Sequence, residues 1–307
     1  MAELPVGAGF GTLVHAVLEV VDPTTPDLLG ELVTRCREQL ARQPIAGLDP
    51  ATLAAGLLPS ILTPLGPLAG GLRLADISPR DRLAELDFEL PLAGGDDAGR
   101  GPTDGEPAGR QPAGLDARGP RPTGPGPAGP RAAPRPTLGD LAPLLRRHLP
   151  ADDPLRAYPD VLASPELAAQ PLRGYLTGSI DAVLRLPDGR FVVVDYKTNW
   201  LGPIGPEGRE PLTAAHYTAP LLAAAMIAAN YPLQALLYGA ALHRFLRWRQ
   251  PRYAPARHLG GVLYLFIRGM CGPDTPTVGG VPCGVFSWAP PPGLVVELSD
   301  LLDRGAP

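Results

Sequence analysis

The most regular pattern of hydrophobic and polar positions lies just past the middle of the chain. Residues 176–186 are rich in apolar and β-branched side chains, and residues 191–196 are a nearly continuous apolar run, so both are predicted to be strands. Pro187, Asp188 and Gly189 lie between them. Proline and aspartate suit the centre of a type I turn, and glycine suits the left-handed residue that follows. The pattern predicts a β-hairpin with a three-residue loop.

The loop length sets which residues face each other across this hairpin. If Leu186 pairs with Arg190, Asp181 falls directly opposite Asp195, with Cβ atoms about 5 Å apart. Lys197 follows two residues later and points to the same face. A two-residue loop would instead place the two aspartates on opposite faces, so the prediction depends on the turn type.

Two facing carboxylates beside a lysine indicate a cation site. Like charges placed opposite one another destabilise a sheet, and a divalent metal removes that cost. Oxygen ligands from one or two carboxylates, completed by water and phosphate oxygens, are typical of Mg²⁺. The alternative is a solvated hairpin edge with scattered charges. The four apolar residues before Asp195 favour a buried strand and therefore the metal site.

Hydrophobic periodicity predicts the remaining elements. Residues 11–20 form a helix with Thr12 as a plausible cap, and residues 83–90 alternate apolar and acidic positions as a half-buried strand does. Further helices are expected at 28–42, 50–58, 137–149, 218–230 and 233–248, a buried strand at 261–268, and weaker strand or loop segments at 282–287 and 293–296. This order predicts an α/β fold with a central mixed β-sheet flanked by helices.

A change in composition divides the chain into three parts. Between residues 93 and 136, glycine, proline, alanine, arginine and aspartate dominate, and no aromatic residue occurs. Such a segment cannot bury enough apolar surface to offset the entropy of ordering, so a disordered insertion is predicted there. Residues 1–92 then form an N-terminal helical part, and residues 137–307 form the core of the domain.

Charge and cysteine content narrow the possible functions. The net charge of −4 argues against a generally basic nucleic-acid coat, although a local basic groove remains compatible with it. Cys36, Cys271 and Cys283 are widely spaced, which favours neither a disulfide framework nor a zinc site and makes the cytoplasm the expected compartment. No signal peptide, membrane span or P-loop is visible, so neither a membrane association nor an ATPase is predicted.

The candidate metal residues also occur in a recognisable order. The chain contains Ile180-Asp181, and later Val194-Asp195-Tyr196-Lys197-Thr198-Asn199-Trp200. This pattern resembles the signature of PD-(D/E)xK nucleases, and more closely the C-terminal nuclease domain of RecB-type helicase–nucleases. The resemblance implies a restriction-endonuclease-like core in which Asp181 and Asp195 bind Mg²⁺. Lys197 would orient the attacking water or stabilise the developing negative charge.

Other residues gain a candidate role through the same resemblance. The run from Gly9 to Glu19 resembles the family's first nuclease motif, whose histidine, His15 here, coordinates the metal. Glu19 lies four residues later on the same helix face and would support His15. Glu85 matches an acidic position of the family. Spacing alone does not choose among Glu85, Asp87 and Glu89, and solvent-facing acids are an equal alternative for all three.

The predicted helix at 233–248 carries a further family motif. Gln234 and Tyr238 are four residues apart and resemble the pair that follows the catalytic lysine in RecB-type nucleases. They could hold that lysine or a phosphate, or simply form an ordinary helix face. The helix continues into a basic stretch in which Arg244 and Arg247 suit contacts to DNA phosphates, with a solvated helix end as the alternative.

Together these features predict a Mg²⁺-dependent DNA nuclease acting in double-strand-break repair and recombination. The resemblance implies single- and double-stranded DNA ends as substrate, and RecC- and RecD-like subunits and RecA as possible partners. The alternative is a non-catalytic module that docks RecA or binds DNA, or a truncated remnant of a helicase–nuclease subunit. Cleavage of DNA by the isolated chain would separate these interpretations.

Overall fold

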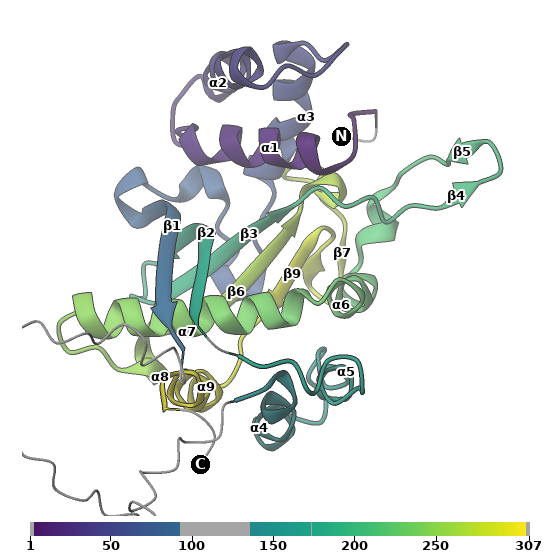
Figure 1. Ribbon diagram of the computed structural model, residues 1–307. Coiled ribbons are helices and arrows are strands. Elements are labelled where there is room, and N and C mark those ends of the chain that lie inside the picture. The colour runs from purple at the N-terminus through teal and green to yellow at the C-terminus, as the bar shows by residue number, and fades with distance from the viewer. Residues whose placement is uncertain (1–2, 93–135, 173, 305–307) are drawn as a thin grey trace, which may run out of the picture.

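The computed structural model describes residues 3–92, 136–172 and 174–304 (Figure 1). The helices are α1 (Ala8–Val20), α2 (Leu28–Arg42), α3 (Pro50–Leu62), α4 (Leu141–His148), α5 (Tyr158–Leu162), α6 (Ala219–Ala228), α7 (Tyr231–Arg249), α8 (Pro255–His258) and α9 (Pro292–Arg304). The strands are β1 (Arg82–Pro91), β2 (Tyr175–Arg185), β3 (Phe191–Lys197), β4 (Ile204–Gly205), β5 (Gly208–Arg209), β6 (Leu259–Phe266), β7 (Thr277–Val278), β8 (Val281–Pro282) and β9 (Val285–Trp288).

Five strands form a central mixed sheet in the order β1-β2-β3-β6-β9. β1, β2 and β3 run antiparallel to one another, β3 and β6 are parallel, and β9 returns antiparallel to β6. A parallel pair needs a crossover connection, and α6 and α7 lie on it. Helices cover both faces of the sheet (Figure 1). The predicted α/β fold with a central mixed sheet flanked by helices is confirmed.

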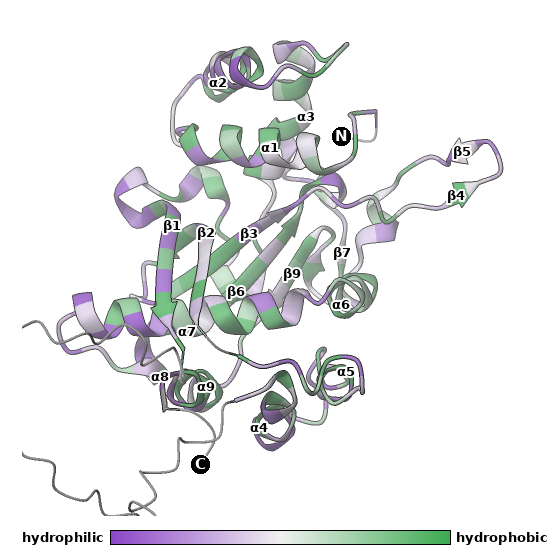
Figure 2. Cartoon of the chain, in the orientation of Figure 1, coloured by the Kyte–Doolittle hydropathy of each residue, from purple (hydrophilic) through white to green (hydrophobic). Residues whose placement is uncertain are grey.

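The sheet separates two hydrophobic cores. Residues of α1, α2 and α3 pack against the face that carries Ala182 and Val194. Residues of α4, α6, α7 and α9 pack against the opposite face, which carries Val193 and Tyr264. Val193 and Val194 therefore point into different cores, as the period of two requires. Because both faces are covered, the central strands are hydrophobic almost throughout, as the colouring of β6 shows (Figure 2).

The predicted hairpin joins β2 and β3. Their register runs from Arg185↔Phe191 to Ala182↔Val194. The Leu186 amide donates to the Arg190 carbonyl at 2.8 Å, and the Gly189 amide donates to the Leu186 carbonyl at 2.9 Å. Gly189 has φ 87°, in the left-handed region. The three-residue loop is confirmed, and its register brings Asp181 level with Asp195.

Most other predicted elements agree with the structure within a few residues. The prediction that Thr12 caps the first helix is wrong. α1 begins at Ala8, Gly7 precedes it, and the Thr12 hydroxyl instead donates to the Ala8 carbonyl at 3.2 Å inside the helix. The glycines at the start of the chain hid its first turn, because glycine is a weak indicator of helix.

The C-terminal helix α9 corrects the prediction of a strand or loop at residues 293–296. The signal that was missed is a spacing of four, with Leu294, Leu298 and Leu302 all buried. A proline at the first helical position completes this pattern, since it is well tolerated there. The predicted helix at 137–149 is also shorter than expected, because a 3₁₀ turn at Leu138–Asp140 precedes α4.

Two predictions concern parts of the chain rather than single elements. All of the predicted insertion except Pro136 lies outside the described residues, so the three-part division of the chain stays a prediction. No single helix in the described ranges is long and apolar enough to cross a membrane. Two pairs of consecutive helices, each bent at a short break, are long and apolar enough when the two helices are counted together. They are Pro50–Leu62 with Pro67–Asp76 and Ala219–Ala228 with Tyr231–Arg249.

Candidate active site

The candidate site lies where β2 and β3 separate, beyond the last paired residues Ala182 and Val194. The β2–β3 pairing ends at those two residues. Beyond them the Asp181 side chain bonds to β3, and its Oδ2 accepts a hydrogen bond from the Tyr196 amide at 2.8 Å. This contact fixes one carboxylate oxygen of Asp181 against β3. The other oxygen is turned toward α1, on the side of the sheet that the N-terminal helices cover.

Asp195 is a buried carboxylate with an incomplete set of partners. Its side chain is 2% exposed, and its Oδ2 lies 2.7 Å from the Lys197 ammonium. Among the residues that the structure describes, this buried oxygen has the ammonium as its ion-pair partner and no donor in regular hydrogen-bond geometry. Burial raises the pKa of Asp195 to about 6, with Asp181 adding to the rise and Lys197 opposing it. Burial therefore outweighs the attraction of the neighbouring ammonium in setting the pKa of this carboxyl.

Lys197 is held by residues of α7 and β6. Its ammonium donates to Gln234 Oε1 at 3.2 Å and lies 4.0 Å from the ring centre of Tyr231 and 5.3 Å from that of Tyr264. The Gln234 amide in turn donates to the Tyr238 hydroxyl at 2.8 Å. The structure thus brings Gln234 and Tyr238 to the lysine, which is one of the two roles that the sequence left open for them.

His15 reaches the site from α1. Its Nδ1 lies 3.2 Å from Asp181 Oδ1, and its ring meets the Tyr196 ring edge-on with 6.1 Å between centres. Burial alone would lower the pKa of His15, but the hydrogen bond and the charge of Asp181 outweigh burial and raise it. This contact holds the imidazole beside one of the two carboxylates of the site.

Arg82, the first residue of β1, fixes the end of the helix that carries His15. Its guanidinium donates to the carbonyl of Val21 at 3.1 Å and to that of Glu19 at 3.4 Å, and it also contacts the Leu18 carbonyl. These carbonyls have no partner within the helix. A cation at this end also complements the helix dipole. A charged contact therefore adds to the apolar packing that holds α1 against the sheet.

The donor set fits a hard divalent ion held by few protein ligands. No three His, Cys, Asp or Glu side chains in residues 3–92, 136–172 and 174–304 are grouped as a ready ligand set. His15 and Asp181 are in contact, whereas Asp195 is turned to Lys197. Asp195 Oδ2 is buried and has no donor in regular hydrogen-bond geometry among the described residues, and the pKa of its carboxyl is raised. Both features favour a bound cation. Mg²⁺ commonly takes one or two carboxylates and completes its shell with water and phosphate oxygens.

Glu19 and Glu85 lie next to each other. In the described part of the chain, neither of them is seen in contact with Lys197. Both side chains are exposed, and they share a hydrogen bond. Partial burial and the contact with Glu85 raise the pKa of Glu19. Glu85 has φ 50° and lies between Ala84 and Leu86, which pair with the residues on either side of Asp181. The register therefore places Glu85 level with Asp181, and the roles of Glu19 and Glu85 stay a prediction.

The two predicted DNA contacts differ in their surroundings. The Arg244 guanidinium donates to the Ser299 hydroxyl at 2.9 Å and to the Ser299 carbonyl at 2.7 Å, so it joins α7 to α9. Arg247 is exposed. The structure thus gives Arg244 a packing role and leaves Arg247 available to a ligand.

Three relatives of this chain, all named RecBCD enzyme subunit RecB, show what it is similar to. The RecBCD enzyme subunit RecB of Mycobacterium tuberculosis (strain H37Rv) is 53% identical over 309 residues, which cover 99% of this chain and 24% of that protein. The same subunit of Mycolicibacterium smegmatis is 52% identical over 307 residues, covering 100% and 25%. This chain is a RecB homologue. The subunit of Escherichia coli K12 is 28% identical over 302 residues, covering 97% and 19%.

The predicted relationship to RecB is therefore confirmed. The chain spans about a quarter of the length of the two mycobacterial RecB subunits. No protein-family model matches it.

Sequence reasoning about this RecB homologue missed two residues of the site. Tyr231 and Tyr264 enclose Lys197, and their rings stack with 5.8 Å between centres. Tyr231 lies three residues before Gln234, so the helical period could have placed it near the same face. Tyr264 belongs to β6 and is paired with Asp195, a contact that only the parallel pairing of β3 and β6 reveals.

Proposed function

We propose that this chain is a Mg²⁺-dependent DNA nuclease of the RecB type that hydrolyses phosphodiester bonds. The observation that carries the proposal is the pairing of buried Asp195 with Lys197 at the end of β3, beside Asp181 and His15. A carboxylate that is 2% exposed and lies beside a second carboxylate is costly in a purely structural role. The relationship to RecB supports the same reading.

In the proposed site Asp181 and Asp195 hold Mg²⁺, with His15 as the third protein ligand. Bound Mg²⁺ supplies polarisation of the phosphoryl oxygen and acidification of the attacking water. His15 must be neutral to bind a cation, so binding would displace any proton shared with Asp181. Asp195 must be ionised, and a bound cation favours that form.

Lys197 acts on the phosphate or on the nucleophile. Its ammonium faces the carboxylate of Asp195, and the contacts with Gln234 and Tyr231 restrict its position. A fixed cation beside the reacting phosphoryl group stabilises the charge that develops as the water oxygen bonds to phosphorus and the ester oxygen departs. Such contacts involve the backbone and not base edges, so weak sequence preference is expected.

The name of the relatives suggests the context of this activity. They are called subunits of the RecBCD enzyme. By analogy, we propose a role in processing double-strand DNA ends during repair and recombination, in the cytoplasm. RecC- and RecD-like subunits and RecA are the proposed protein partners.

Cleavage by the isolated chain tests this function. Single-stranded DNA is incubated with the wild type and with the Asp195→Ala variant, each in Mg²⁺ and in EDTA. We expect cleavage only by the wild type in Mg²⁺, with the variant retaining its far-ultraviolet circular dichroism spectrum. Cleavage by the folded variant would exclude the assigned site. A wild type that binds DNA or RecA but never cuts would favour the non-catalytic alternative.

A further inference from the structure

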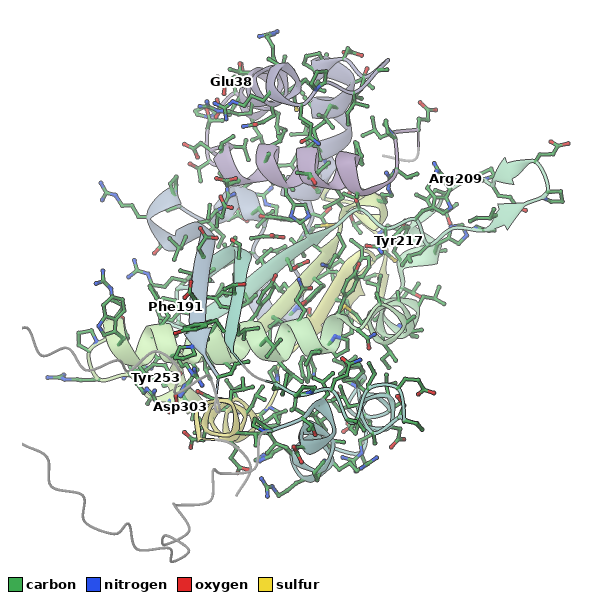
Figure 3. The ribbon with its side chains drawn as sticks, in the orientation of Figure 1. Glu38, Phe191, Arg209, Tyr217, Tyr253 and Asp303 are labelled. Carbon is green, nitrogen blue, oxygen red and sulfur yellow. The ribbon has the colours of Figure 1, made fainter. Side chains whose placement is uncertain are left out.

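The end of α7 and the turn into α8 form a basic surface with one exposed aromatic ring, here called the α7–α8 surface. Trp248 is 76% exposed, as much as any large hydrophobic residue in the described part of the chain. The α7–α8 surface consists of five exposed residues, namely Arg247, Trp248, Arg249, Arg252 and Arg257. Figure 3 labels Tyr253 and Asp303 at this end of the molecule.

The arginines of the α7–α8 surface stand apart from the other surface arginines in how they are paired. Among the residues that the structure describes, none of the four forms an ion pair, whereas the surface arginines Arg35, Arg73, Arg146, Arg147, Arg185 and Arg190 each pair with an aspartate or glutamate. The sequence explains the difference, since no aspartate or glutamate occurs between Glu210 and Asp274. Asp300 and Asp303 of α9 act electrostatically on Arg244. Unpaired positive charge of this density fits a polyanion.

Trp248 adds an aromatic face to this charge. The Arg249 guanidinium lies 4.8 Å from its ring centre, so the indole is held beside a cation. Exposed aromatic rings flanked by arginines are the stacking platforms of proteins that bind single-stranded nucleic acids. A duplex offers its bases only inside the stack, so a stacking ring selects unpaired bases.

Helix α7 connects this surface to the candidate active site. Gln234, which binds Lys197, and Trp248 belong to the same uninterrupted helix. Their 14-residue separation in the sequence corresponds to ~21 Å along the axis and about 40° around it. Both residues therefore lie on one side of α7. An open cleft lined by Gln234, Tyr238 and Phe88 lies beside the site, and its lining on α7 ends at Tyr238.

We propose that the α7–α8 surface is a second binding site for single-stranded DNA, distinct from the residues that act on the scissile phosphate. Arg247, Arg249 and Arg252 contact the backbone, and one base stacks on Trp248. The site holds the strand about 21 Å along α7 from Gln234, the residue that binds Lys197. This second site rests on the proposed nuclease function. It adds single-stranded DNA as the ligand, and α7 sets the spacing between the two sites.

Binding of labelled oligothymidylate in EDTA tests the proposal without cleavage. Fluorescence anisotropy compares the wild type with Trp248→Ala and Trp248→Phe. We expect Trp248→Ala to raise the Kd by about fivefold or more, the loss of one stacked base, and Trp248→Phe to bind nearly as the wild type does. Because Trp248 is exposed, neither change should alter the thermal midpoint of unfolding.

A charge variant tests the backbone contacts. In Arg247→Gln/Arg249→Gln/Arg252→Gln, the slope of log Kd against log salt should fall by about 2, near 0.7 for each lost phosphate contact. The matched control is Arg35→Gln, which removes an arginine already paired with Glu31 and should leave the slope unchanged. An oligothymidylate too short to span ~21 Å should show no effect of Trp248→Ala on its cleavage in Mg²⁺.

The outcomes separate this proposal from the nuclease function. Unchanged affinity and salt slope in both variants would overturn the second site, even if the wild type cleaves DNA, and would leave the surface to a protein partner. Weakened binding in both variants would support it, even if the wild type proves unable to cleave.

Discussion

At the scale of single residues, the ammonium group of Lys197 contacts a carboxylate, an amide oxygen and two aromatic rings. Each contact is modest, but together they leave the side chain little freedom. A lysine normally loses considerable rotamer entropy when it must adopt one position. Here the Lys197 side chain is ordered when the protein folds, so little further rotamer entropy is lost when substrate binds.

Asp195 should make the metal-free protein less stable above pH ~6. Its pKa is raised by burial from 3.8 to about 6, so the folded state disfavours the ionised form by up to about 3 kcal/mol. This cost is absent below the ordinary pKa and complete above the raised one. In EDTA, Asp195→Asn should therefore unfold at higher urea concentration than the wild type above pH ~6, and the difference should vanish in acid.

Mg²⁺ provides the control for this prediction. It should stabilise the wild type more than Asp195→Asn, because the variant has lost one of the two proposed carboxylate ligands. A variant that is less stable than the wild type at every pH would contradict the raised pKa.

Removal of the Tyr231 ring should affect turnover and spare binding. The ring faces the Lys197 ammonium at 4.0 Å, a contact of ~0.5–2 kcal/mol, so Tyr231→Leu should lower kcat by about 2- to 30-fold with little change in KM. Tyr231→Phe keeps the ring and loses only the hydroxyl contact with Asn199, so it should retain most activity. Steady-state kinetics on single-stranded DNA measures both. A rise in KM alone would show that Tyr231 binds substrate instead.

At the scale of elements, the site depends on how α1 and α7 approach the sheet from opposite faces. The hairpin register was predictable because a three-residue loop is a local feature. The contact between Lys197 and Tyr231 was not, because it depends on the angle at which α7 crosses β3 and β6. The contact between Glu19 and Glu85 was likewise hidden, since it requires the end of α1 to pack on β1. Patterns within one element thus predicted more than contacts between elements.

Loss of the Arg82 contact should loosen α1 and release His15 from Asp181. Arg82→Met removes the donor that binds the last carbonyls of α1, at a cost of about 2 kcal/mol in unfolding free energy. Without that contact the pKa of His15, which Asp181 raises, should fall toward its ordinary value. Urea denaturation and NMR titration of the imidazole measure the two effects.

Arg80→Met is the matched control, because Arg80 is exposed and lies two residues earlier. It should leave the stability and the titration of His15 unchanged. An Arg82→Met protein in which His15 titrates as in the wild type would show that α1 is positioned by packing alone.

At the scale of the whole molecule, one buried arginine joins the N-terminal segment to two loops that follow strands of the sheet. Arg268 is 5% exposed and donates to the carbonyl of Thr198 at 2.8 Å and to that of Leu4 at 3.3 Å. Its guanidinium also lies 5.2 Å from the ring centre of Phe10. The N-terminal segment, the loop after β3 and the turn after β6 therefore meet at one charge.

Arg268→Met should destabilise the fold and free the N-terminus. Loss of several charge-assisted hydrogen bonds to carbonyls predicts a decrease of about 2–3 kcal/mol in unfolding free energy. Hydrogen–deuterium exchange should rise at residues 4–10 and hardly change in α9. The control is Arg209→Met in the β4–β5 hairpin, where the guanidinium stacks on Trp200. Uniform exchange across the chain would contradict this local role.

The loop at Gly189 also bears on the order in which the molecule folds. β2 and β3 are joined by three residues, whereas β3 meets β6 only after the long crossover through α6 and α7. Local pairs close at small entropic cost and can form first. A Cβ at Gly189 would meet nothing within 4 Å, so Gly189→Ala tests the backbone alone, at about 1 kcal/mol.

If the hairpin belongs to the folding nucleus, Gly189→Ala should slow refolding about fivefold and leave the unfolding rate nearly unchanged. Stopped-flow chevrons measure both rates, and a variant that only unfolds faster would exclude the hairpin from the nucleus. Early closure of this loop would align Asp181 with Asp195 while most of the chain is still unfolded. The spacing of the two carboxylates would then be inherited from the first event of folding, before either helix that serves the site has docked.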